Sequence, residues 1–271
     1  HFIENKKLYL SFHYSTNDFY IFLSTECNAE ELKLIETNGD LIGSFKTREY
    51  DGVKIYELEN KWNLCHHKDI LFMSSSSLLI EDGIRQLNNE ISLLDNTEFK
   101  KVQTTKSTFA GAHIYINYSS LSKLLSQNTK LSKSNEKWIS WWANWAELDL
   151  ESSENNLTLS GFTLVEDSSS NYLTSLFDQL EQKIEVSKVA PRNTYKITAL
   201  GIEDYNLFYA NYKDFLAKHN NLYEHNKALS DIKSKYNLDI EKYFNGIVLN
   251  EMGTISTFST SGKSDDFIFI K

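Results

Sequence analysis

The run Cys65-His66-His67 contains the residue types in this chain that are best suited to metal binding or nucleophilic catalysis. Thiolate and imidazole groups bind zinc, and they also act as nucleophile and base. Adjacent residues on a strand, however, point to opposite faces of the sheet. No second pair of ligands stands at metal-binding spacing. We therefore predict ordinary surface or core residues here, and no metal site.

The other candidate side chains are dispersed along the chain. His113 stands alone in an expected strand, and His219 and His225 are six residues apart. Glu203 and Asp204 are expected to begin a helix, where acidic residues complement its dipole. A hydrolytic pair of carboxylates would have to converge in a cleft, and the sequence does not reveal such convergence.

Glu251 lies in an otherwise apolar expected strand. It is either a buried acid with a partner or a solvent-facing residue, and we favour solvent exposure or a structural hydrogen bond.

Motifs for nucleophilic catalysis and nucleotide binding are absent from the sequence. The run Ser74-Ser75-Ser76-Ser77 has no G-x-S-x-G context, so we interpret it as a helix N-cap region. No glycine-rich phosphate-binding loop occurs. We predict a noncatalytic protein without a cofactor, and the sequence identifies no ligand-binding residue.

Four of the five tryptophans, Trp138, Trp141, Trp142 and Trp145, lie within eight residues. On one helix their spacing would place all four indoles within about 100° of arc. We favour packing in the core or at a domain interface, with protein or sugar contact as the alternative. Downstream, Gly161-Phe162 suggests a bulge or close packing within a strand.

Composition narrows the class of protein and its partners. The 271 residues are 41% hydrophobic and carry a net charge of -9 without a basic stripe, so we expect no binding to nucleic acid or anionic lipid. No apolar run is long enough to span a bilayer. Both ends look cut from a longer protein, so an anchor is expected in a missing flank. Cys27 and Cys65 could form one bridge, but two buried free thiols are favoured.

Periodicity predicts an α+β fold, with antiparallel sheets from hairpins and interleaved helices. The expected domains are residues 1–183 and 194–271, joined by a linker at 184–193, although one continuous domain or two similar subdomains remain alternatives. The expected strands cover 8–22 (a hairpin), 43–46, 53–58, 69–74, 112–118, 146–151, 156–165, 194–200, 247–256 and 266–271. The expected helices cover 29–35, 77–90, 97–102, 120–125, the tryptophan segment 138–145, 172–183 (capped by Ser168, Ser169 or Ser170), 203–219, 222–236 and 240–244, with a loop at 127–135.

Several of these segments together resemble a bacterial family of unknown function, DUF3352. The resemblance rests first on Trp145-x-x-Leu148-Asp149-Leu150 and on Leu157-x-Leu159-x-Gly161-Phe162-Thr163. Further matching positions are Ser74-x-Ser76 with Leu79 and Ile84, Tyr115-Ile116-Asn117-Tyr118, Leu173 to Gln179, Pro191-x-Asn193-Thr194, Asp204 with Phe208, and Glu251.

Members of that family are envelope-associated proteins with an N-terminal membrane anchor or signal and no established activity. The resemblance implies an exported, uncharacterised α+β module from the bacterial cell envelope, periplasmic or membrane-anchored in the full-length protein, with another envelope protein as its expected partner. We therefore expect a binding or scaffolding role. A hydrolase with Asp or Glu as acid and base, and a glycan- or peptide-binding module, are the alternatives.

Overall fold

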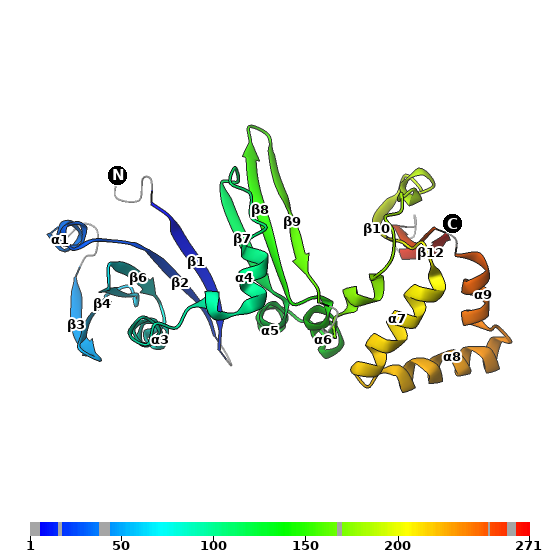
Figure 1. Cartoon of the computed structure of the whole chain (residues 1–271), viewed down its shortest axis with the longest axis horizontal. Coiled ribbons are helices and arrows are strands. Elements are labelled where there is room, and N and C mark those ends of the chain that lie inside the picture. The colour runs from blue at the N-terminus through cyan, green and yellow to red at the C-terminus, as the bar shows by residue number, and fades with distance from the viewer. Residues whose placement is uncertain (1–5, 16–17, 38–43, 167–169, 249, 259–263) are drawn as a thin grey trace. The chain divides into compact units, whose positions relative to one another are not determined.

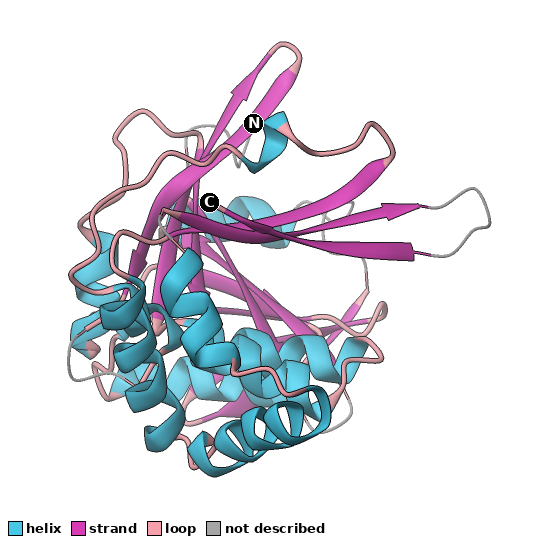
Figure 2. Ribbon diagram, turned by 90° about the vertical axis from the view of Figure 1, so that its right-hand side faces the viewer, coloured by secondary structure: helices cyan, strands magenta, loops and turns pink. Residues whose placement is uncertain are grey.

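The computed structural model describes residues 6–15, 18–37, 44–166, 170–248, 250–258 and 264–271. Helices and three antiparallel sheets confirm the predicted α+β class (Figures 1 and 2). The chain divides into two compact units, one formed by residues 1–140 and 145–162, the other by 141–144 and 163–271. The expected linker at 184–193 lies inside the second unit.

The first unit begins with a six-stranded sheet in the order β1-β2-β6-β5-β4-β3. Helix α3 contacts β5 and β6, and Ile80 and Ile84 are buried against Phe72 and Cys65. Alternating apolar residues in the strands and apolar positions at helical spacing in α3 explain this core. The elements are β1 (Leu8–Tyr14), β2 (Phe19–Glu26), α1 (Ala29–Thr37), β3 (Phe45–Tyr50), β4 (Val53–Leu58), β5 (Asn63–His67), β6 (Ile70–Ser74) and α3 (Ser77–Asn88).

The predictions for this sheet are largely confirmed. The expected hairpin at 8–22 is the antiparallel pair β1 and β2, although Thr16 and Asn17 of its turn lie outside the described residues. The expected strand at 43–46 begins at Phe45 and continues to Tyr50, with Gly43 outside the described residues. Strand β5, which carries Cys65, was not predicted, because the polar residues at both of its ends interrupt the alternation of apolar and polar residues.

A second sheet of the first unit has the order β7-β8-β9. Its hairpin is the long green pair in Figure 1. Helix α4 packs on β8, and α5 follows β7. The elements are the 3-10 helix η1 (Leu93–Asp95), α4 (Thr97–Gln103), β7 (Ala112–Asn117), α5 (Tyr118–Asn128), α6 (Lys133–Trp142), β8 (Trp145–Ser153) and β9 (Asn156–Leu164).

Two predictions about the middle of the chain were wrong. The expected loop at 127–135 contains the end of α5 and the beginning of α6. The four tryptophans do not share one helix, because α6 ends at Trp142 and Trp145 begins β8. The backbone amide of Asn144 donates to the carbonyl of Leu164 at 3.4 Å, so sheet pairing replaces helical pairing at this point.

The second unit contains a three-stranded sheet in the order β10-β11-β12, and α7, α8 and α9 follow one another between β10 and β11 (Figure 1). Its elements are η2 (Tyr172–Leu176), η3 (Val186–Lys188), β10 (Thr194–Gly201), α7 (Tyr205–Lys218), α8 (Leu222–Tyr236), α9 (Ile240–Ile247), β11 (Glu251–Phe258) and β12 (Ser264–Ile270).

The expected helix at 172–183 is only the short 3-10 helix η2. The chain after η2 is not helical, and the Gln179 side chain attaches it to the beginning of α7. Gln179 Oε1 accepts the backbone amides of Glu203 and Asp204, both at 2.9 Å. The N-cap residue of η2 is Asn171 and not the expected Ser170, and the Asn171 side chain makes no capping hydrogen bond. Ser168 and Ser169 lie outside the described residues. The expected strand at 247–256 begins only at Glu251, because α9 continues to Ile247.

Candidate functional site

The antiparallel pairing of β7 with β8 brings one histidine and two carboxylates onto a single face of the sheet. His113 lies directly opposite Asp149, and Tyr115 lies opposite Glu147. Side chains two residues apart on a strand share a face, and directly opposite residues are close neighbours. The same face carries Trp145 near its beginning.

Helix α4 covers the aromatic part of this face. The ring of Phe99 meets Tyr115 and Trp145 edge-on, with centroid separations of 5.1 and 5.2 Å. Apolar packing therefore encloses one side of the charged residues. His113, Glu147 and Asp149 are called the carboxylate–histidine cluster below.

Within this cluster the contacts are short and uneven. His113 Nδ1 lies 2.7 Å from Asp149 Oδ1 and 3.4 Å from Glu147 Oε1. The backbone amide of Ser107 donates to both oxygens of Asp149, at 3.1 and 2.9 Å. The hydroxyl of Thr105 lies 3.4 Å from Glu147 Oε2. Asp149 is thus firmly held, whereas Glu147 Oε1 is buried without a hydrogen-bond donor.

Burial and charge separate the two carboxylates. Burial, reinforced by the neighbouring Asp149, raises the pKa of Glu147, which is fully buried. Burial acts in the same direction on Asp149, but the Ser107 amide and His113 outweigh it and lower the pKa of that carboxyl. Burial and the two carboxylates raise the pKa of Tyr115. The environment therefore displaces the pKa values of the two carboxyl groups in opposite directions.

Sequence reasoning missed this cluster, because His113 was predicted to stand alone. One signal in the sequence could have indicated the cluster. Trp145, Glu147 and Asp149 alternate along one strand, so both acids share a strand face with a tryptophan that is expected to be buried. What the sequence lacked was the register that sets His113 opposite Asp149.

The other sequence candidates have structural roles. Cys65 lies in the core, His66 Nε2 lies 2.7 Å from the carbonyl of Cys27, and His67 Nε2 lies 2.7 Å from Asn88 Oδ1. Both Cys27 and Cys65 are free and buried, and burial raises the pKa of the Cys65 thiol to about 12. The side chains of Cys65, His66 and His67 therefore have different surroundings and do not form a common site.

The predicted helix N-cap region at residues 74–77 is confirmed. Ser76 caps α3 by accepting the Leu79 amide, and Ser74 donates its hydroxyl to the carbonyl of Ile21. Asp204, which was expected at a helix start only as a charge that complements the dipole, also caps α7 by accepting the amides of Asn206 and Leu207.

The histidines at 219 and 225 do not come together in a ligand set. His219 packs on Trp141 with a centroid distance of 4.1 Å, and His225 Nε2 lies 2.9 Å from the hydroxyl of Tyr209.

Glu251 is fully buried, so the solvent-facing alternative was wrong and the structural hydrogen bond is confirmed. Its carboxylate accepts the backbone amides of Glu185 at 2.8 Å and Val186 at 2.9 Å. These bonds attach the segment at 184–193 to β11.

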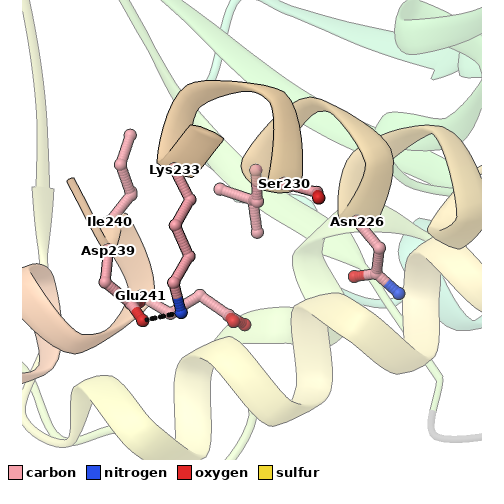
Figure 3. A pocket seen from close by; sticks show the side chains of 7 residues that line it. Asn226, Ser230, Lys233, Asp239, Ile240 and Glu241 are labelled. Atoms are coloured by element: carbon pink, nitrogen blue, oxygen red, sulfur yellow. Dashed lines mark hydrogen bonds and ion pairs between the residues drawn. The ribbon is translucent and has the colours of Figure 1, made fainter. Parts of the chain in front are cut away.

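A pocket lies between α8 and α9 in the second unit (Figure 3). Lys233 Nζ and Asp239 Oδ2 form an ion pair at 2.7 Å across its mouth. Hydrogen bonding and charge raise the pKa of Lys233 and lower that of Asp239. Both charges are mutually satisfied, and the other lining residues include Asn226, Leu229, Ser230, Ile240 and Glu241.

Comparison of the chain with protein-family models, with curated proteins and with solved structures finds no match. The resemblance to DUF3352 stays a prediction. Among the described residues, no helix has the length and apolar character needed to cross a membrane.

Proposed function

We propose that the chain is a noncatalytic binding or scaffolding module of an exported bacterial envelope protein, with another envelope protein as its partner. The envelope location rests on the resemblance of the central segments to DUF3352. The binding role rests on one surface of the second sheet, the face opposite the carboxylate–histidine cluster.

That surface is an apolar face on β7, β8 and β9. Ile114 pairs with Leu148 across β7 and β8, and Leu150 follows on the same face. Strand β9 is the neighbour of β8, and Gly161 of β9 lies against the backbone of Leu148. Leu159 and Leu157, two and four residues from Gly161, therefore lie on the same face of the sheet as Leu148 and Leu150. We call Ile114, Leu148, Leu150, Leu157 and Leu159 the apolar face.

The apolar face is open to solvent at several positions. Leu157 is 73% exposed and Leu159 54% exposed, and Ile114 is 39% exposed. Contiguous exposed apolar patches on soluble proteins mark interaction surfaces more often than isolated apolar residues do. A protein surface is the partner that would bury such a flat apolar strand face.

The test is to place charges on this face. Replacing both leucines (Leu157→Lys with Leu159→Lys) in the full-length protein should abolish its cross-linked complex in intact cells, or weaken it at least tenfold. The two exposed side chains contribute little to folding, so the chain should keep its secondary structure. The measurement is the yield of cross-linked complex, with circular dichroism as the check on folding.

The control is Thr158→Lys, which adds a charge to the opposite face of the same strand. This variant should retain the complex. Equal loss in both variants, or no loss in either, would contradict the apolar face as the docking surface. Fractionation of cells that produce the full-length protein tests the envelope location separately.

A hydrolase is the second candidate, because the pKa values of Glu147 and Asp149 are displaced in opposite directions beside His113. Against it stands the burial of both carboxylates, which keeps a polymeric substrate away from them. Turnover in a broad hydrolase screen that disappears with Glu147→Gln would favour this second candidate over the first.

A further inference from the structure

We propose that His113, Glu147 and Asp149 form a binding site for one divalent transition-metal cation of the zinc class. The site lies on the opposite face of the sheet from the apolar face, so it does not depend on the proposed docking role.

The positions of the donor atoms fit a small metal ion. One donor atom from each residue lies within 4.8 Å of the other two, and His113 Nδ1 is 2.7 and 3.4 Å from the nearest carboxylate oxygens. Tetrahedral bonds of about 2.1 Å separate ligand atoms by about 3.4 Å. Small shifts of side-chain torsions would therefore centre a cation among the three groups without moving β7 or β8.

Glu147 gives an independent reason to expect a ligand. Its side chain is fully buried, and its Oε1 atom, which points toward His113, receives no hydrogen bond from a described residue. Leaving a buried carboxylate oxygen unpaired costs free energy, because nothing replaces the water that it has lost. A cation bound at this oxygen would remove that cost.

The surrounding groups would orient the ligands as outer-shell partners do in metal sites. The Ser107 amide bonds both oxygens of Asp149 and fixes that carboxylate, and the Thr105 hydroxyl lies near Glu147 Oε2. Such partners fix the geometry of the ligands and increase affinity. The partly exposed imidazole of His113 marks the route by which an ion could enter, because its side chain is 28% exposed.

The donor set selects the class of ion. Calcium requires six to eight oxygen ligands, whereas one imidazole nitrogen with two carboxylate oxygens suits zinc and neighbouring transition metals. Two carboxylates and a neutral imidazole also balance the charge of a divalent ion. Metal binding requires His113 Nδ1 and both carboxylates in their deprotonated forms.

The experiment is calorimetric titration of the chelator-treated chain with Zn²⁺. We expect one bound ion per chain. Co²⁺ in the same site should give visible absorption bands. His113→Ala and the nearly isosteric Glu147→Gln should each weaken binding by about tenfold or more. Because His113 is partly exposed, its variant should fold even if the Glu147 variant does not.

The matched control is His67→Ala, which removes another histidine of the first unit and should leave the affinity unchanged. Three outcomes would overturn the proposal: no one-to-one binding by the unmodified chain, binding that survives both His113→Ala and Glu147→Gln, or binding lost with His67→Ala. Any of these results would show that the cluster is not the metal site.

Discussion

At the scale of single residues, the two fully buried glutamates differ in how their oxygens are satisfied. Glu251 uses both oxygens to accept backbone amides, so its burial is matched by hydrogen bonds. Glu147 has one oxygen without a donor and a histidine nearby. A satisfied buried acid stabilises a fold, whereas an unsatisfied one costs stability unless a ligand or a proton compensates. This difference makes Glu147 the residue with a chemical role to test.

For Glu251 we predict a purely structural effect. Glu251→Ala leaves the amides of Glu185 and Val186 without an acceptor in a largely buried place, and should lower the free energy of unfolding by about 2–4 kcal/mol. Urea unfolding measures the change. The control Glu203→Ala removes an acceptor for the amide of the exposed Leu180 and should cost about 0.5 kcal/mol or less. Equal losses in the two variants would contradict this account.

At the scale of secondary-structure elements, the β8–β9 hairpin depends on a close approach of its strands at Gly161. A Cβ atom at this position would collide with the backbone of Glu147 and Leu148. The sequence suggested a bulge or close packing at Gly161, and close packing is what the structure contains. The glycine thereby fixes the strand that carries both carboxylates of the cluster.

We predict that Gly161→Ala destabilises the chain by about 1–3 kcal/mol, because the added methyl group forces the two strands apart. Thermal unfolding followed by circular dichroism would measure the loss. Gly111→Ala is the matched control in the same sheet, since a Cβ there meets only the carbonyl of Leu150 at an ordinary 3.7 Å. A Gly161 variant as stable as the Gly111 variant would show that the strands are not in close contact.

At the scale of the whole molecule, the chain consists of two units that are each held together by distant segments. In the second unit, Glu185 pairs with Lys188 at 2.7 Å and with Lys271, 86 residues away in sequence. Hydrogen bonds and charge from these two lysines lower the pKa of Glu185 from 4.5 to about 2. This exposed network joins the segment after η2 to the chain beyond β12.

The lowered pKa of Glu185 predicts the direction of a pH effect. A carboxyl whose pKa falls on folding stabilises the folded state above its unfolded pKa, and the contribution disappears as the pH falls from 4.5 through about 2. Glu185→Gln should therefore reduce the acid sensitivity of the melting temperature in that range. The exposed Glu181→Gln serves as the charge-matched control, and an identical pH profile for both variants would contradict the prediction.

The sequence alone determined the fold class and the types of most elements. The alternation in β1 and β2 and the helical spacing of Ile80 and Ile84 are local patterns that backbone geometry converts directly into strands and helices. The N-cap region that contains Ser76 was identifiable for the same reason, because capping involves only the next few residues. These features need no knowledge of distant contacts.

Only the tertiary structure decided which residues meet. The register of β7 against β8 brings His113 beside Asp149, and β11 brings Glu251 to the amides at 185 and 186. Pairing with β9 also ended α6 before Trp145, although the tryptophan spacing continued the helical pattern. Strand pairing joins residues that are far apart in sequence, and a shift of one residue would turn every side chain to the other face. Local periodicity contains no information about that register, so the cluster became visible only in the folded chain.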